Sequence, residues 1–175
     1  MEPSPRPFLP PPVHAVTGPP LASPIDLSSG EAGAGKVTVI SHVTALERRP
    51  HGWTPTGDAG ALLLGPVTAA LHSLVIRIPG EHRINGLQTS AELQLRYIPE
   101  EGTQVALAIP VVSGPDAAAL EPILGGVLDV RRLLPAPRGV LVYAGTETIP
   151  PFQRPTMWAV SRTPLTATPE QLAHL

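Results

Sequence analysis

LHSLVIRIPGEHRINGLQTSAELQLRY, residues 71–97, predicts two β-strands joined by a connection that contains Pro-Gly and Asn-Gly. Side chains alternate between the two faces of a strand. One face of the pair is apolar and is formed by Leu74, Ile76, Ile78, Ala91, Leu93, Leu95 and Tyr97. The other face is formed by Ser73, Val75, Arg77, Glu92, Gln94 and Arg96. The pair therefore combines a core-forming face with an unusual cluster of polar groups.

This pair resembles the central strands of the α-class carbonic anhydrases, in which FHFH-x-x-SEH-x-x-(D/N)G is followed by AELHLVH. Here the segments read LVIRIPGEHRING and AELQLRY. Four further matches keep the family's order, namely SPIDL at 23–27, RRLLP at 131–135, YAGTETIPPFQRPTMWAV at 143–160 and PLTATPEQLAHL at 164–175. The resemblance implies a mostly β fold with a central, largely antiparallel sheet and short helices. Because the chain is shorter than a typical member, we also expect it to be truncated at the C-terminus, with an exposed sheet edge.

Members of this family bind a zinc ion through three histidines, whose positions fall on Val75, Arg77 and Gln94. Valine has no donor atom, arginine stays protonated, and a single amide oxygen is a poor zinc ligand. We therefore predict no zinc and no other cofactor at these positions. The six histidines of the chain show no H-x-H or HExxH spacing, although a relocated site formed by residues distant in sequence stays an alternative.

The resemblance also implies that residues around the zinc site are retained. Glu81 and Thr148 match the pair that orients the reactive hydroxyl, His82 matches a structural histidine, and Glu92 matches the carboxylate behind the third ligand. Such residues normally orient metal ligands. Without a metal, we expect them to support the fold.

Two changes of charge accompany the lost histidines. We hypothesise that Arg77 takes roughly the place of the metal charge and compensates Glu92. By the same resemblance Arg96 and Glu147 fall on the apolar wall that would hold carbon dioxide, while Trp158 is kept. The wall is therefore predicted to be charged.

Composition excludes several classes of protein. A formal net charge of −2 over 175 residues gives no basic surface for nucleic acid, and no apolar run is long enough to insert into a membrane. The chain has no cysteine, so it can form neither a disulfide nor a thiolate metal site. The N-terminus does not resemble a signal peptide, which makes a cytoplasmic or virion-interior location the default prediction.

Residues 1–22 are predicted to form a Pro-rich extended arm, and residues 23–175 one carbonic-anhydrase-like domain. The arm is either a disordered leader or a segment that docks on a protein partner through Phe8, Leu9, Val13 and Val16. A second loop, 47–60, contains Arg48, Arg49, His51 and Trp53. This loop is read as solvated, with binding of a phosphate or sulfate group as the alternative.

Periodicity predicts the remaining elements. We expect a loop at 28–36, a strand at 36–46, a hairpin about Gly65-Pro66, a buried strand at 105–112, a helix within 113–128 and a last helix after Thr168.

The sequence as a whole predicts a structural or binding protein that is not an enzyme, most simply a subunit of a virion or another multi-protein assembly that self-associates or binds a protein partner. Two alternatives stay open. One is a carbonic anhydrase, or another lyase or hydrolase, with a relocated metal or with acid-base chemistry at Glu81, Glu92 and Thr148. The other is a cell-surface adhesion module that binds a glycan, or a module that binds a small anion at Arg77 and Arg96.

Overall fold

The computed structural model describes residues 23–28, 30, 32–115, 118–134, 139–149 and 154–175, and the following account concerns these residues. The predicted arm lies outside them, together with Phe8, Leu9, Val13 and Val16. The docking role of the arm therefore stays a prediction.

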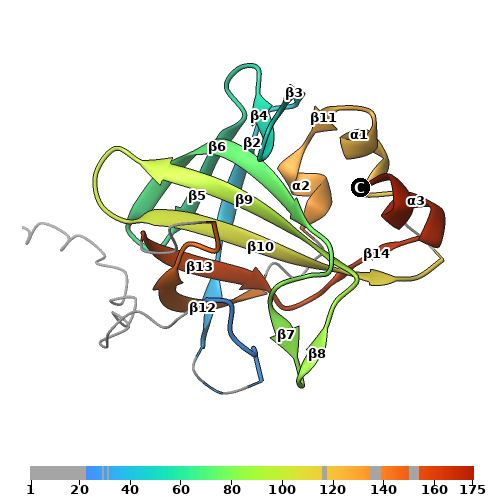
Figure 1. Ribbon diagram of the computed structural model, residues 1–175. Helices are drawn as coiled ribbons and strands as arrows, with labels where there is room; N and C mark the ends of the chain where they lie inside the picture. Colours follow the sequence, from blue (N-terminus) through green and yellow to red (C-terminus); the bar gives the residue numbers. More distant parts are fainter. Residues whose placement is uncertain (1–22, 29, 31, 116–117, 135–138, 150–153) are drawn as a thin grey trace, which may run out of the picture.

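A large, mixed β-sheet dominates the fold, with three short helices beside it (Figure 1). Its twelve strands include the path β1-β12-β13-β10-β9-β6-β4-β3-β11, and β2, β5 and β14 pair off this path. Most pairs are antiparallel, as predicted, but β10 runs parallel to β13 and β14. The strands are β1 (Gly33–Lys36), β2 (Thr38–Ser41), β3 (Thr44–Arg49), β4 (Gly52–Pro55), β5 (Gly60–Leu64), β6 (Val67–Arg77), β7 (Arg83–Ile84), β8 (Leu87–Gln88), β9 (Ala91–Pro99), β10 (Gln104–Ser113), β11 (Val127–Leu128), β12 (Gly139–Thr146), β13 (Pro155–Ser161) and β14 (Leu165–Ala167). The helices are α1 (Glu121–Leu124), α2 (Val130–Leu133) and α3 (Pro169–His174).

The two strands predicted from 71–97 are β6 and β9, and they pair antiparallel at the centre of the sheet. Leu74 lies opposite Leu95 on the apolar face. Val75 lies opposite Gln94, and Arg77 opposite Glu92, on the polar face. The predicted assignment of faces is therefore confirmed within the paired strands, whereas Ile78 follows the end of β6 and is exposed. The separate β7–β8 hairpin occupies the connection.

The main core lies against the apolar face of β9 and β10. Leu93, Leu95, Leu107 and Ile109 are fully buried there. On the opposite face a smaller apolar cluster contains Ile25, Ala106, Ala108, Tyr143, Trp158 and Val160. Because both faces are covered, β10 reads as the continuous apolar strand that the sequence predicts.

Three local predictions differ from the structure. The 28–36 loop contains strand β1, which pairs with β12; Gly35 allows this approach, since an added Cβ would lie 2.7 Å from Cγ2 of Val142. The strand predicted at 36–46 is interrupted and forms β2 and β3. The helix predicted within 113–128 shortens to α1, which ends at Gly125 and Gly126. By contrast, α3 begins after Thr168 as predicted, with a complete capping box.

The ends of the strand path are β1 and β11, each paired with one strand among the described residues. The association that the sequence predicts through a free edge stays a prediction. In the described part of the chain, no helix is long and apolar enough to span a bilayer.

The backbone at Gly60 tests the pairing of β2 with β5. Gly60 has φ of +93°, and a Cβ there would lie 1.9 Å from the carbonyl oxygen of Ile40. We expect Gly60→Ala to lower the free energy of unfolding by more than about 2 kcal/mol, measured by urea denaturation. The matched control is Gly57→Ala, because no atom lies within 4 Å of a Cβ at that position. Equal stability of the two variants would contradict the pairing.

Candidate functional site

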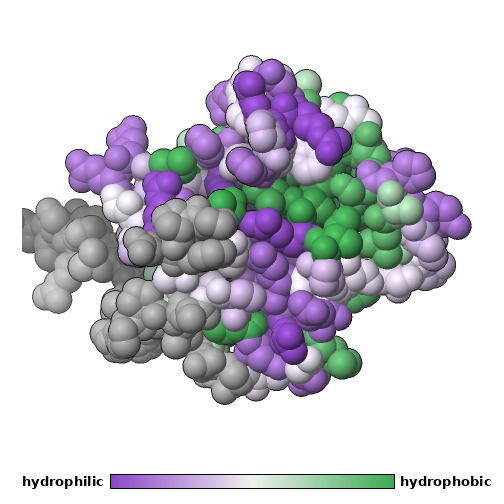
Figure 2. Space-filling view, in the orientation of Figure 1, coloured by the Kyte–Doolittle hydropathy of each residue, from purple (hydrophilic) through white to green (hydrophobic). Residues whose placement is uncertain are grey.

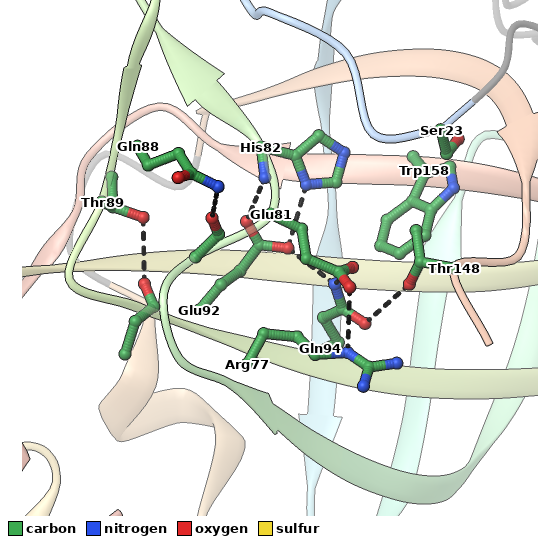
Figure 3. A network of polar contacts seen from close by, with 12 residues as sticks. Ser23, Arg77, Glu81, His82, Gln88, Thr89, Glu92, Gln94, Thr148 and Trp158 are labelled. Carbon is green, nitrogen blue, oxygen red and sulfur yellow. Dashed lines mark hydrogen bonds and ion pairs between the residues drawn. The ribbon is translucent and has the colours of Figure 1, made fainter.

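The polar face of β9 is organised around the amide of Gln94, which is fully buried. Its Nε2 donates to Oε2 of Glu81 and to Oε1 of Glu92, both at 2.8 Å (Figure 3). Its Oε1 accepts from Nη2 of Arg96 at 3.2 Å and from Oγ1 of Thr148 at 3.4 Å. An amide offers two donor and two acceptor positions, so Gln94 uses its full capacity.

The fully buried carboxylate of Glu92 is held by His82 as well as by Gln94. It accepts from the backbone N–H of His82 at 3.0 Å and from its Nδ1 at 2.9 Å. Burial alone would raise the pKa of Glu92, but the hydrogen bonds from His82 and Gln94 and the attraction of His82 together hold this pKa below its ordinary value. Glu92 is therefore a buried, ionised carboxylate, and both of its oxygens accept hydrogen bonds.

The other ring nitrogen of His82 continues the network. Its Nε2 lies 2.6 Å from the hydroxyl of Tyr143, which donates to Oγ of Ser23 at 3.1 Å. Burial raises the pKa of the Tyr143 phenol. Trp158 packs edge-on against the His82 ring at 4.9 Å between centroids. His82 and Trp158 thus connect β9, β12 and β13.

Arg77 pairs with Glu81, not with Glu92. Its Nε lies 3.2 Å from Oε1 of Glu81, and both side chains are about one quarter exposed, at 28% and 23%. Although Arg77 lies opposite Glu92 in the strand register, Glu92 obtains its compensation from His82 and Gln94. The hypothesis that Arg77 compensates Glu92 is therefore wrong, while its position in the cluster agrees with expectation.

Gln94 also separates the predicted pair of Glu81 and Thr148. Glu81 accepts from the amide nitrogen and Thr148 donates to the amide oxygen, so the two share Gln94 and are not bonded directly among the described contacts. Sequence reasoning missed this role of Gln94, because it depends on two loops that converge from 78–90 and from the segment after β12.

The predicted charged wall exists as an ion pair between Arg96 and Glu147, both largely buried. Burial, with repulsion from Arg77 and Arg154, lowers the pKa of Arg96 to about 10, although attraction by Glu81 opposes this. Nε of Arg96 is buried and has no hydrogen-bond partner among the described residues. The region is thus rich in guanidinium groups.

A cleft of about 490 Å³ opens beside this network. Its described lining combines the cationic or titratable side chains of Arg48, His51 and Arg77 with apolar side chains, and it includes no acidic residue. The lining residues are Arg48, Pro50, His51, Gly52, Trp53, Val75, Ile76, Arg77, Ile149 and Leu175. Figure 2 shows hydrophilic and hydrophobic surfaces side by side in the middle of this face.

The 47–60 loop thus contributes to the site and is not merely solvated. Strand β4 pairs with β6 through Trp53 and Leu74, which brings the loop to the cleft. Arg48 lies over the Trp53 ring, with Cζ 5.5 Å from the centroid. Arg49 instead pairs with Glu47 at 2.9 Å.

The residues at the three expected ligand positions do not fit a zinc ion. Val75 offers no donor, Arg77 is a cation engaged with Glu81, and the oxygen of Gln94 already accepts two hydrogen bonds. In the residues that the structure describes, no group of three His, Asp or Glu side chains could hold a metal ion elsewhere. The structure therefore gives no set of residues through which zinc chemistry can be derived.

Removal of the Glu92 charge should reveal its contribution to stability. A glutamine has only one acceptor oxygen, so Glu92→Gln would turn its NH₂ group towards donors of His82 or Gln94. We expect a loss of about 1–3 kcal/mol in the free energy of unfolding at pH 7. The folded-state pKa is below the ordinary 4.5, so the stabilisation is present above that value and is lost as pH falls through the lowered pKa.

The difference between wild type and Glu92→Gln should therefore shrink in urea denaturation below about pH 4.5. Glu100→Gln, at an exposed position, is the control and should show no such dependence. A difference that stays constant between pH 7 and pH 3 would refute the ionised state of Glu92.

Comparison with known proteins identifies chains with a similar sequence and fold. No protein-family model matches the chain. A carbonic anhydrase from Nostoc sp. is 27% identical over 107 residues, which are 53% of this chain and 40% of that protein, so the match covers about two fifths of the relative. The α-carbonic anhydrase from Thermovibrio ammonificans, in complex with the inhibitor sulfanilamide, superposes with a TM-score of 0.77 at 23% identity, covering 88% of this chain and 76% of that one. The Photobacterium profundum α-carbonic anhydrase gives 0.75 at 20% identity, with 93% and 81% covered.

These comparisons correct one prediction and confirm another. The prediction that the chain is not an enzyme is wrong, because the proteins that it resembles are carbonic anhydrases, which are enzymes. The prediction considered only zinc binding. The three unsuitable side chains argue against a zinc ion at those positions, but they do not exclude acid-base catalysis by carboxylates such as Glu81. The resemblance seen in the sequence is confirmed: the chain has the α-carbonic-anhydrase fold and is similar in sequence, over part of its length, to a carbonic anhydrase.

Proposed function

We propose that the cleft binds a small anion, a carboxylate or bicarbonate, through the guanidinium group of Arg77. The observation on which this proposal rests is the state of that group. Its Nε lies in ion-pair contact with Glu81 at 3.2 Å but without hydrogen-bond geometry, and the two terminal nitrogens have no acceptor among the described residues and no dashed line in Figure 3. A guanidinium group presents paired N–H donors that match the two oxygens of a carboxylate.

The charge around the cleft favours an anion over a cation. Arg48 and Arg77 line it, and the described lining has no Asp or Glu. Arg96 does not line the cleft, and its charge is offset by its ion pair with Glu147. Glu81 offsets part of this charge, but its carboxylate is engaged by Arg77 and Gln94.

The hydrogen-bond network also supports a preorganised site. Gln94 fixes Glu81 at 2.8 Å, and Glu81 in turn fixes Arg77. A side chain held in its binding orientation loses less conformational entropy when the ligand binds. We infer that Gln94 and Glu81 orient Arg77 through these contacts.

The proposal leaves the other predicted roles open. Self-association, a protein partner, a place in a virion or other assembly, and adhesion to a glycan stay predictions. Binding of an anion is compatible with each of them and with acid-base chemistry in the same cleft.

Titration of wild type with sodium acetate and with bicarbonate at low ionic strength, followed by isothermal calorimetry or NMR, tests the proposal. We expect saturable binding, and we expect Arg77→Gln to weaken it at least about tenfold, because a charge-assisted contact is lost. Arg162→Gln is the matched control, since Arg162 is exposed and does not line the cleft.

The fold of each variant should be checked by thermal unfolding in the same buffer. Equal affinities of Arg77→Gln and wild type, with both folded, would overturn the assignment of Arg77. No binding of either anion by wild type at millimolar concentrations would overturn the proposed function.

A further inference from the structure

The cleft is larger than a small inorganic anion requires. Its volume of about 490 Å³ leaves room for a ligand larger than an inorganic ion. Bicarbonate and acetate would contact Arg77 and leave most of this volume to water. The remaining volume therefore raises the question of which larger ligand could fill it.

The walls of the cleft are apolar where they do not present Arg77. Val75 lies beside Arg77 on the polar face of β6, and Ile149 comes from the loop after β12. Ile76 and Trp53 lie on the opposite face and reach the cleft at the edge of β6 beyond Leu74, where the pairing with β4 ends. Trp53, Ile76 and Ile149 are each partly exposed, so their surfaces are available to a ligand. Apolar contacts of this kind stabilise a bound hydrocarbon body but give nothing to an inorganic ion.

We propose that the ligand is an organic carboxylate with an apolar, preferably aromatic, body: the carboxylate binds Arg77 and the body packs against Trp53, Ile76 and Ile149. This inference rests on the proposed function and narrows its ligand class. The valine at position 75 fits the same arrangement, because it presents methyl groups where a polar ligand-binding residue would hold water.

The Arg48 side chain adds selectivity for a negative ligand at the same place. It lies over one face of the Trp53 ring and is exposed, so it contributes positive charge close to the apolar wall. A neutral compound of the same shape would use the wall but not the two guanidinium groups. Charge and apolar area are thus both needed.

Four probes separate these contributions in calorimetric titrations of the full chain: bicarbonate, acetate, benzoate and benzyl alcohol. We expect benzoate to bind at least about tenfold more tightly than acetate or bicarbonate, since its ring buries apolar surface. We expect benzyl alcohol, which lacks the charge, to bind at least about tenfold more weakly than benzoate.

A pair of variants tests the apolar wall. Ile149→Ser should weaken benzoate binding several-fold and leave acetate binding unchanged, because only the ring contacts this side chain. Val43→Ser is the matched control, at a valine that is 64% exposed and does not line the cleft, and it should change neither affinity.

The outcomes distinguish this inference from the proposed function. Equal affinities for benzoate and acetate, or loss of both in Ile149→Ser with the fold intact, would overturn the organic ligand while binding at Arg77 stands. Binding of benzyl alcohol as tight as that of benzoate would overturn the role of Arg77 itself. Absence of binding by all four probes would overturn both proposals.

Discussion

The hydrogen bonds of one buried amide organise the polar face of the sheet. Gln94 has no exposed surface and connects two carboxylates on its nitrogen side with a guanidinium and a hydroxyl on its oxygen side. A buried amide with unmet hydrogen bonds would cost about 1–3 kcal/mol, so the surrounding residues are constrained to meet them. The positions of Glu81, Glu92, Arg96 and Thr148 follow from this constraint.

This arrangement explains how the fold accommodates charged groups at its centre. The ionised Glu92 is compensated by His82 and Gln94, and Arg77 is compensated by Glu81 through one edge only. Arg77 also lines the cleft. A scaffold shared with the carbonic anhydrases therefore presents a fixed cation where the resemblance places a ligand of zinc, and a fixed cation attracts anions.

The sequence predicted the parts that depend on local pattern. Alternation in β6 and β9 assigned both faces, and the Thr168 cap located the start of α3. It failed where distant contacts decide. Strand β1 contains two glycines with low strand propensity and exists because β12 pairs with it. Likewise the pairing of β4 with β6 brings Trp53 to the cleft. Two loops that meet at Gln94 complete the hydrogen bonds of its amide, and neither of these contacts follows from periodicity.

The central claim is that the positions of Val75, Arg77 and Gln94 do not form a zinc site and that Arg77 binds an anion there instead. The most direct test is zinc binding, measured by metal analysis and chelator competition on wild type beside the variant Val75→His/Arg77→His/Gln94→His. The account predicts less than about a tenth of an equivalent in wild type and about one equivalent in the variant, whose three imidazoles would complete a typical ligand set. Near-stoichiometric zinc bound tightly by wild type would contradict it.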